Sequence, residues 1–174
     1  GGGSVIRSGL LDEIKKSLDE EYISYEELGG VKPNPRLSFA RKGVEKAIAF
    51  GAELILAVGG GSAIDTAKGI AIGAANPGTD IWEFWKNKKE LKTALPVGTV
   101  LTISAAGSEM SNSAVLTDEE TQDKSGIGSD LIRPKFAIMN PELTYTIPKY
   151  QLTCGIVDIF MHTIERLFHT GTWK

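Results

Sequence analysis

The feature that most constrains the fold is a short apolar run that leads directly into three consecutive glycines. Residues 54–58 read Leu-Ile-Leu-Ala-Val, and Gly59, Gly60 and Gly61 follow at once. A continuous apolar run of this length is typical of a strand that is covered on both faces in a parallel sheet. Residues 63–75 then place apolar side chains at helical spacing, which predicts a helix packed on that sheet. The chain therefore turns at the glycines, between a buried strand and a helix.

The neighbouring segments continue this alternation of helices and strands. Pro35 suits the first turn of a helix that continues until Gly51 stops it. Residues 96–100 and 135–139 predict two further short strands, and the polar stretch 117–129 between them predicts a hairpin or an exposed loop. Strands that alternate with helices favour an α/β fold with a Rossmann-like parallel sheet.

The C-terminal segment differs, because from Pro148 onward it predicts a single helix with a broad apolar face. This face extends over about three helical turns. Its members are Ile156, Val157, Phe160, Met161, Ile164, Leu167 and Phe168. No other segment is left to cover the face, and no strand precedes the glycines at positions 1–3. We therefore expect the sequence to be cut at both ends.

Charge and cysteine content exclude several classes of function. The formal charge of −3 comes from 19 basic and 22 acidic residues spread along the chain, which leaves no basic surface for nucleic acid or a membrane. No apolar run is long enough to cross a membrane, and residues 1–4 lack the features of a signal peptide. The single cysteine, Cys154, has no disulfide partner and is interpreted as a small buried apolar residue. We expect a soluble, cytoplasmic protein.

The strand, glycine turn and helix around Gly59–Ser62 have the composition of a phosphate-binding turn. Glycines let a pyrophosphate approach the backbone, and free amides and the helix dipole favour the anion. The alternative is a tight turn that needs glycine for its geometry alone. Asp65, one turn into the helix, is either a carboxylate that favours the helix start or a group that faces the ligand.

Two other segments carry weaker signals for phosphate binding. The string Gly1-Gly2-Gly3-Ser4 has the composition of a linker as much as of a second glycine turn. Residues 102–109 are rich in small hydroxyl side chains, which suit a second loop around a phosphate or nicotinamide. A solvated Ser/Gly loop is the alternative interpretation, and without other evidence it is favoured.

Asp158 and His162 form a candidate pair of metal ligands on the C-terminal helix. They are four residues apart, which places both on one face within reach of one cation. A carboxylate with an imidazole suits Fe²⁺ or Zn²⁺. On spacing alone, an ordinary side-chain contact is the favoured interpretation of such a pair.

Several ordered motifs, taken together, resemble the iron-containing (group III) alcohol dehydrogenases, and most closely their butanol-dehydrogenase-like branch. The resemblance runs over essentially the whole chain. Its carriers are Gly1-Gly2-Gly3-Ser4 with Gly9-Leu10-Leu11-Asp12, Gly29-Gly30-Val31-Lys32-Pro33-Asn34-Pro35-Arg36, Gly59-Gly60-Gly61-Ser62-Ala63-Ile64-Asp65, Gly107-Ser108-Glu109-Met110, Arg133-Pro134-Lys135-Phe136-Ala137, and Gly155-Ile156-Val157-Asp158 leading to His162-Thr163.

The resemblance implies a dehydroquinate-synthase-like fold and reversible hydride transfer between NAD(P)(H) and a primary alcohol or aldehyde. Residues 1–147 would be a dinucleotide-binding α/β domain that lacks its first strand, and 148–174 the truncated start of an all-α metal-binding domain. Asp158 and His162 match the first two ligands of Fe²⁺ or Zn²⁺, which would act as a Lewis acid. The cofactor would lie against Gly3, Ser4, Asn34, Gly60, Gly61, Ser62, Asp65, Thr102, Ser108, Lys124 and Leu143.

Departures from the family pattern modify these expectations. Family members that prefer NAD carry an acidic residue at the position of Gly3, so glycine there predicts NADP. Ala106 replaces a threonine, which removes one hydroxyl from the cofactor cleft, and Ser111 displaces the usual asparagine. The family's two remaining metal ligands are histidines beyond position 174, so this chain alone is expected to be inactive.

Two other functions fit parts of this sequence. The chain could instead be a non-catalytic dinucleotide-binding or assembly module, since half a metal site binds weakly and an uncovered helix invites a partner. A related metal chemistry, sugar-phosphate cyclisation or polyol-phosphate oxidation, fits the motifs less well. The expected partners are a small alcohol or aldehyde and a second copy of the chain in a homodimer or higher oligomer, with neither nucleic acid nor membrane.

Overall fold

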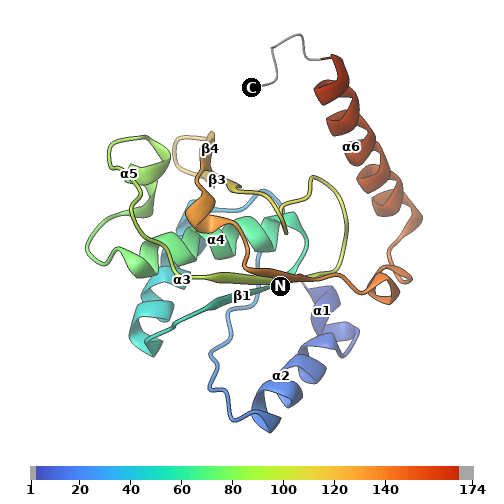
Figure 1. Ribbon diagram of the computed structural model, residues 1–174, viewed down its shortest axis with the longest axis horizontal. Coiled ribbons are helices and arrows are strands. Elements are labelled where there is room, and N and C mark those ends of the chain that lie inside the picture. Colours follow the sequence, from blue (N-terminus) through green and yellow to red (C-terminus); the bar gives the residue numbers. More distant parts are fainter. Residues whose placement is uncertain (1–2, 169–174) are drawn as a thin grey trace.

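A three-stranded parallel sheet lies at the centre of the computed structural model, which describes residues 3–168 (Figure 1). Its strands are β1 (Ile55–Gly59), β2 (Val97–Leu101) and β5 (Phe136–Ile138), with β2 in the middle. The register pairs Ile55 with Val97 and Gly98 with Phe136. The predicted α/β fold and all three predicted strands are confirmed, each shifted by no more than one residue at either end.

Helices cover both faces of the sheet, as Figure 1 shows. On one side lie α3 (Leu37–Phe50) and α4 (Gly61–Ala75), and on the other α1 (Gly3–Arg7) and α2 (Leu10–Glu20). Successive side chains of each strand therefore point to opposite faces of the sheet. Ala57 and Leu101 pack with residues of α4, whereas Val100 packs with Val5 of α1 and Leu10 of α2. Burial on both faces explains why residues 54–58 are continuously apolar.

The helix predicted from Pro35 to Gly51 is α3, and it packs closely on α4. Gly51 ends α3 in the left-handed conformation, with φ 71°, as a helix-terminating glycine does. Within α3, a Cβ on Gly43 would lie 2.3 Å from Cδ1 of Ile70 on α4. The absence of a side chain at this position therefore sets the distance between the two helices.

The polar stretch after β2 forms the predicted hairpin, which shares a hydrophobic core with α3, α4 and α5. Strands β3 (Ser113–Asp118) and β4 (Asp123–Gly128) pair antiparallel, and β3 packs on α4. The short helix α5 (Ile81–Trp85) was not predicted, and Asp80 caps it by accepting a hydrogen bond from the Trp82 amide at 3.0 Å. Two 3₁₀ turns follow, η1 (Asp130–Ile132) and η2 (Pro141–Thr144). The core here comprises Leu37, Ala40, Ile72, Ile81, Phe84, Trp85, Ala114, Leu116 and Ile132.

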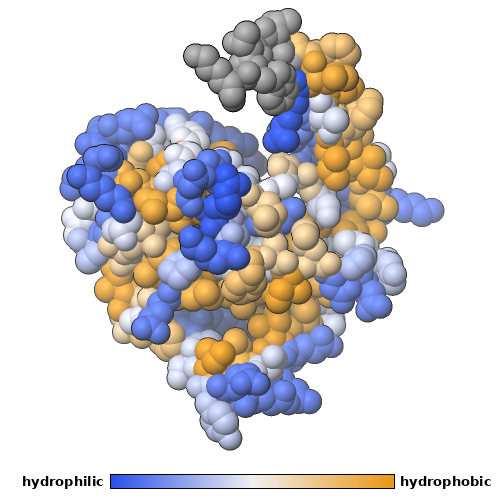
Figure 2. All heavy atoms as spheres, viewed as in Figure 1, coloured by the Kyte–Doolittle hydropathy of each residue, from blue (hydrophilic) through white to orange (hydrophobic). Residues whose placement is uncertain are grey.

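The last helix, α6 (Lys149–Phe168), projects away from the sheet (Figure 1). Gly155 is its only buried residue in the described range, and Figure 2 shows a band of apolar side chains exposed along it. The predicted uncovered apolar face is therefore present. Cys154 is exposed, so its predicted burial is wrong, because α6 meets the rest of the chain only around Gly155. A domain boundary after residue 147 stays a prediction.

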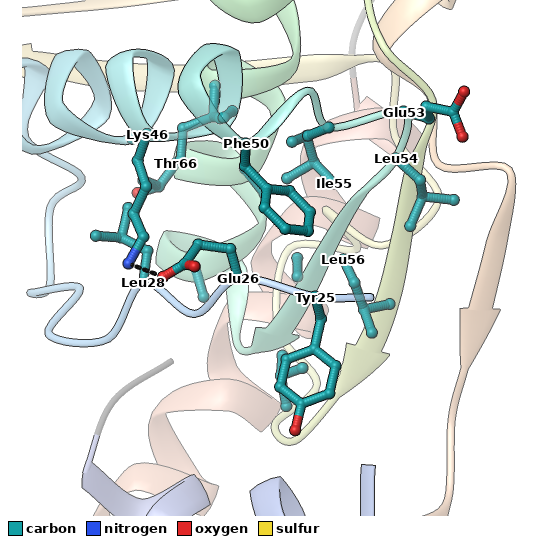
Figure 3. A pocket seen from close by; sticks show the side chains of 18 of the residues that line it. Tyr25, Glu26, Leu28, Lys46, Phe50, Glu53, Leu54, Ile55, Leu56 and Thr66 are labelled. Atoms are coloured by element: carbon teal, nitrogen blue, oxygen red, sulfur yellow. Dashed lines mark ion pairs between the residues drawn. The ribbon is translucent and has the colours of Figure 1, made fainter. Parts of the chain in front are cut away.

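The outer edge of β1 is open within the described residues, since β1 pairs only with β2. The extended segment 22–32 passes near this edge and is held by ion pairs of 2.6 Å, Lys15 with Glu27 and Lys46 with Glu26. Between this segment and β1 lies a hollow of about 800 Å³, into which Leu54 and Phe50 point (Figure 3).

The expectations for the first glycine string and for a membrane-spanning segment depend on which residues the structure describes. Gly1 and Gly2, part of the first glycine string, and residues 169–174 lie outside it, while Gly3 begins α1. Among residues 3–168, no helix has the length and hydropathy of a membrane span.

Candidate functional site

The glycine turn stands where β1 ends and α4 begins. Gly59 has φ 149°, a value that favours glycine, and Gly60 precedes the helix with no side-chain cap. The carbonyl of Gly60 accepts from the amides of Ala63 and Ile64, at 3.0 and 3.2 Å. Within the described residues, the amides of Gly61 and Ser62 have no acceptor. Unpaired amides at the start of a helix of 15 residues are suited to an anion.

A loop that leaves the end of β2 covers one side of the glycine turn. The amide of Thr102 donates to the carbonyl of Gly59 at 3.1 Å. A Cβ on Gly60 would lie 2.5 Å from Cγ2 of Ile103, and one on Gly61 would lie 4.0 Å from Cβ of Ser108. The structure thus brings together four of the predicted cofactor positions, Gly60, Gly61, Thr102 and Ser108.

Asp65 faces this loop, and both of its carboxylate oxygens are bonded within the protein. The hydroxyl of Ser108 donates to Oδ1 at 2.6 Å, and the amide of Val115 donates to Oδ2 at 3.0 Å. Burial raises the pKa of Asp65, and these two hydrogen bonds oppose that rise. Asp65 therefore joins α4 to the loop and to β3; its contact with a cofactor stays a prediction.

Lys68, one turn further along α4, is a member of this network that the sequence analysis missed. Its side chain is fully buried, and its Nζ contacts oxygens of Ser108, Ser111 and Ser113. Burial lowers the pKa of Lys68 to about 8, against the opposing effect of Asp65. A charged residue in an otherwise apolar helix, between Ala67 and Gly69, was the available signal.

Asn34 and Lys124, two further predicted cofactor residues, meet at a second point. Nζ of Lys124 donates to Oδ1 of Asn34 at 3.3 Å. Asn34 has φ 56° and precedes Pro35, whose carbonyl accepts from the amide of Thr117 on β3 at 2.8 Å. The segment before α3 and the β3–β4 hairpin are thereby joined.

The remaining predicted cofactor residues lie on three different elements, α4, η2 and α1. Ser62 is in the first turn of α4, and its carbonyl accepts from the hydroxyl of Thr66 at 2.7 Å. Leu143, in η2, packs against the cluster that contains Val5, on the face of the sheet opposite α4. Gly3 is exposed at the start of α1, and Ser4 follows it in that helix.

The predicted metal ligands lie side by side on α6. Oδ1 of Asp158 is 3.8 Å from Nε2 of His162, and both side chains are about half exposed. The donor types and their closeness fit two ligands of one divalent ion. Among residues 3–168, no group of three or more His, Cys, Asp or Glu is arranged to hold a metal.

Gly155 brings α6 into contact with the loop that follows β2. A Cβ on Gly155 would lie 2.6 Å from the carbonyl oxygen of Ser104, in the loop after β2. Asp158 is one helical turn beyond this contact and His162 one turn further, about 4.5 and 10 Å along the helix axis. The loop 102–108 is therefore shared between the glycine turn and α6.

Comparison with known proteins gives one family and consistent relatives. The model of the family described as iron-containing alcohol dehydrogenase matches residues 1–141. A probable NADH-dependent butanol dehydrogenase of Bacillus subtilis is 47% identical over 97% of this chain, and the NADPH-dependent aldehyde reductase of Escherichia coli is 39% identical over 95%. In both alignments the chain spans 43% of the relative's length.

Solved structures agree with these relatives. The crystal structure of an NADH-dependent butanol dehydrogenase from Thermotoga maritima superposes with a TM-score of 0.91 at 43% identity, covering 95% of this chain and 41% of that one. An archaeal alcohol dehydrogenase from a Red Sea brine pool superposes with a TM-score of 0.94 at 28% identity, covering 99% and 45%.

Proposed function

The chain belongs to the iron-containing alcohol dehydrogenase family, and from this membership we propose that it forms the nicotinamide-binding part of an oxidoreductase. The reaction is hydride transfer between NAD(P)(H) and a primary alcohol or aldehyde. One observation carries the proposal: the free amides of Gly61 and Ser62 at the start of α4, beside a loop that borders the turn. They are suited to the pyrophosphate that NAD and NADP share.

Each group around the turn has a part in this proposal. Gly60 and Gly61 admit the pyrophosphate to the backbone, and Thr102 and Ser108 stand on the opposite wall. The joined pair Asn34 and Lys124 extends the cleft toward the hairpin, where the Lys124 ammonium adds a positive charge. Thr102 and Ser108, together with Ser62, Asp65 and Leu143, complete the proposed cofactor site.

Asp158 and His162 would hold the divalent ion, Fe²⁺ or Zn²⁺, with further ligands from outside the present sequence. The ion supplies Lewis acidity toward the oxygen of the alcohol or aldehyde. The chain's own part is to hold two of the ligands next to the loop 102–108, so that the reacting oxygen and the nicotinamide share one cleft.

We propose NADP(H) as the preferred nucleotide, on the surroundings of Gly3. A Cβ there would lie 3.0 Å from Nη1 of Arg7, so the Arg7 guanidinium lies directly beside Gly3, where a larger residue would contact it. A 2′-phosphate is favoured by such a group, since arginine binds phosphate with paired hydrogen bonds. The names of the relatives divide between NADH and NADPH, so family membership alone does not choose.

Titration of the chain with NADPH and with NADH, followed by intrinsic and nicotinamide fluorescence, tests the proposal. We expect both nucleotides to bind and NADPH to bind more tightly, with no dependence on added Fe²⁺ or Zn²⁺. Tighter binding of NADH would overturn the nucleotide preference while leaving the cleft in place. Binding of neither nucleotide would contradict the proposed function of this chain.

A non-catalytic dinucleotide-binding or assembly module is the second candidate, and the arrangement on α6 supports it. Only two metal ligands come together in the described residues, and the helix exposes an apolar face. The metal content of the protein containing the remaining histidines separates the candidates, since a dehydrogenase should hold about one ion per chain. For either candidate we propose a cytoplasmic homodimer or higher oligomer, a state that light scattering would measure.

A further inference from the structure

Lys68 is a buried ammonium group that uses its full capacity to donate hydrogen bonds. Its side chain is 0% exposed. Its Nζ lies 2.8, 2.9 and 2.8 Å from the carbonyl oxygens of Ser108, Ser111 and Ser113. An ammonium group carries three protons, so the three carbonyls account for all of them. Burial of a charge is costly unless the charged group is fully hydrogen-bonded. The three contacts are therefore needed for Lys68 to be buried in the folded chain.

All three carbonyls belong to one segment, residues 107–113, which is the second half of the connection from β2 to β3 and ends at Ser113, the first residue of β3. Gly107 has φ 77°, and the amide of Met110 donates to its carbonyl at 3.1 Å. From outside, Nη1 of Arg133 donates to the carbonyl of Met110 at 2.6 Å. Lys68 therefore supplies the main attachment of this segment to α4, from the inner side.

The hydroxyl of Ser108 shows how tightly the segment is fixed. It donates its single proton to Oδ1 of Asp65 at 2.6 Å, and its oxygen lies 3.3 Å from Nζ of Lys68, farther than the three carbonyls. With its proton committed to a carboxylate, this hydroxyl has none to donate to a phosphate. The part of Ser108 next to the glycine turn is its Cβ, 4.0 Å from the position of a Cβ on Gly61.

We propose that Lys68 is a positioning residue for nucleotide binding, which holds the segment 107–113 against α4 so that Ser108 in this segment stays fixed beside Gly61. The proposal rests on the proposed function, because the position of Ser108 matters only if a nucleotide occupies the turn. Lys68 lies beneath the segment and reaches the nucleotide only through it.

The charge state of Lys68 gives this role a dependence on pH. Burial lowers its pKa to about 8, while Asp65 and Glu109 raise it and Arg133 lowers it. A neutral amine carries two protons and a lone pair, so it leaves one of the three carbonyls unbonded. Nucleotide affinity should be high below pH 8 and fall as the pH rises through that value, because the protonated form holds the segment in place.

Lys68→Met tests the role of Lys68, and Lys86→Met is the matched control. Lys86 pairs with Asp123 and donates to Ser125 at 2.9 Å, but it joins α5 to β4, away from the glycine turn. At neutral pH we expect Lys68→Met to weaken NADPH binding by about tenfold or more, because the three carbonyls that Lys68 holds are released and Ser108 is no longer fixed beside Gly61. Lys86→Met should bind as the wild type does.

The pH profile separates a positioning role from a merely structural one. Between pH 7 and about 9.5 we expect the affinity of the wild type to fall and that of Lys68→Met to stay constant. Wild-type affinity in Lys68→Met would overturn the proposal. If the variant does not fold, as circular dichroism would show, the wild-type profile decides, and a flat profile overturns the proposal.

Amide hydrogen exchange without nucleotide distinguishes this inference from the proposed function. The amide hydrogens of residues 107–113 should exchange faster in Lys68→Met than in the wild type. In Lys86→Met they should exchange at the wild-type rate. Unchanged exchange in both variants overturns the positioning role. If the wild type binds neither nucleotide, the proposed function fails and this inference fails with it; if the wild type binds and Lys68→Met binds equally well, only this inference fails.

Discussion

Replacement of Gly61 by alanine tests whether the start of α4 receives a phosphate, because it adds one methyl group there and little else changes. In the described residues a Cβ at this position would meet only Cβ of Ser108, at 4.0 Å, which is ordinary van der Waals contact. The position is exposed and lies at the first residue of the helix. The folded chain therefore has room for the methyl group.

The expected change in stability is small and favourable. Alanine is better than glycine inside a helix by about 0.5–1 kcal/mol, and the gain is smaller in the first turn. The free energy of unfolding should thus stay the same or rise by less than about 1 kcal/mol, which corresponds to a rise in Tm of no more than about 4 °C.

The expected change in nucleotide binding is large and unfavourable. A pyrophosphate that contacts the amides of Gly61 and Ser62 must approach where the methyl group would stand. Loss of one hydrogen bond to a charged group costs about 1.5–3 kcal/mol, or about 10- to 150-fold in affinity. Fluorescence titration with NADPH measures this loss, and thermal unfolding measures the stability.

Gly128→Ala provides the control, since a Cβ on Gly128 has nothing within 4 Å and Gly128 lies at the end of β4, opposite Ser113, and not in the glycine turn. It should bind NADPH as the wild type does. Wild-type affinity in Gly61→Ala, together with an unchanged Tm, would show that no ligand approaches this position, and the phosphate role of the turn would be refuted.

Three further predictions follow from contacts at other positions. Gly60→Ala should lower the free energy of unfolding by about 1–3 kcal/mol, because its Cβ would lie 2.5 Å from Cγ2 of Ile103; the added change Ile103→Ala should restore part of it in urea unfolding. Asp80→Ala should cost about 1 kcal/mol near neutral pH, because Asp80 caps α5. Its pKa is lowered by Arg41, so this contribution is present above the unfolded pKa and lost as pH falls through the folded value; an unfolding series that shows the same cost at pH 2 would contradict it. Phe160→Ser, on the exposed face of α6, should change the free energy of unfolding by less than about 0.5 kcal/mol, and a larger loss would mean that α6 is packed in this chain.

The parts of the fold that follow from local patterns were predictable. The strand at 55–59, the glycine turn and α4 follow from a continuous apolar run and helical spacing. The end of α3 follows from Gly51. By contrast, α5 has five residues, too few for a periodic pattern to be recognised.

The network around Lys68 was not predictable, because it joins residues 40 to 45 positions apart. Nothing near Lys68 in the sequence indicates that Ser108, Ser111 and Ser113 return to it. For Asp65, the sequence left two interpretations open, and the contacts with Ser108 and Val115 add a third, a link between α4 and the following loop. Cys154 was expected to be buried because free cysteine is usually a small buried apolar residue, but on α6 it is exposed.

The edge of β1 that is open in the described residues is suited to pairing with a strand of another molecule, so we expect association to increase with concentration. Its unpaired backbone groups face a hollow of about 800 Å³, and the extended segment 22–32 borders the other side. An extended stretch of a neighbouring molecule that entered this space would gain strand pairing and bury apolar surface in one step. Dilute and concentrated samples would then differ in how many molecules are paired through β1. Nucleotide-binding constants measured at high protein concentration would include the effect of this pairing.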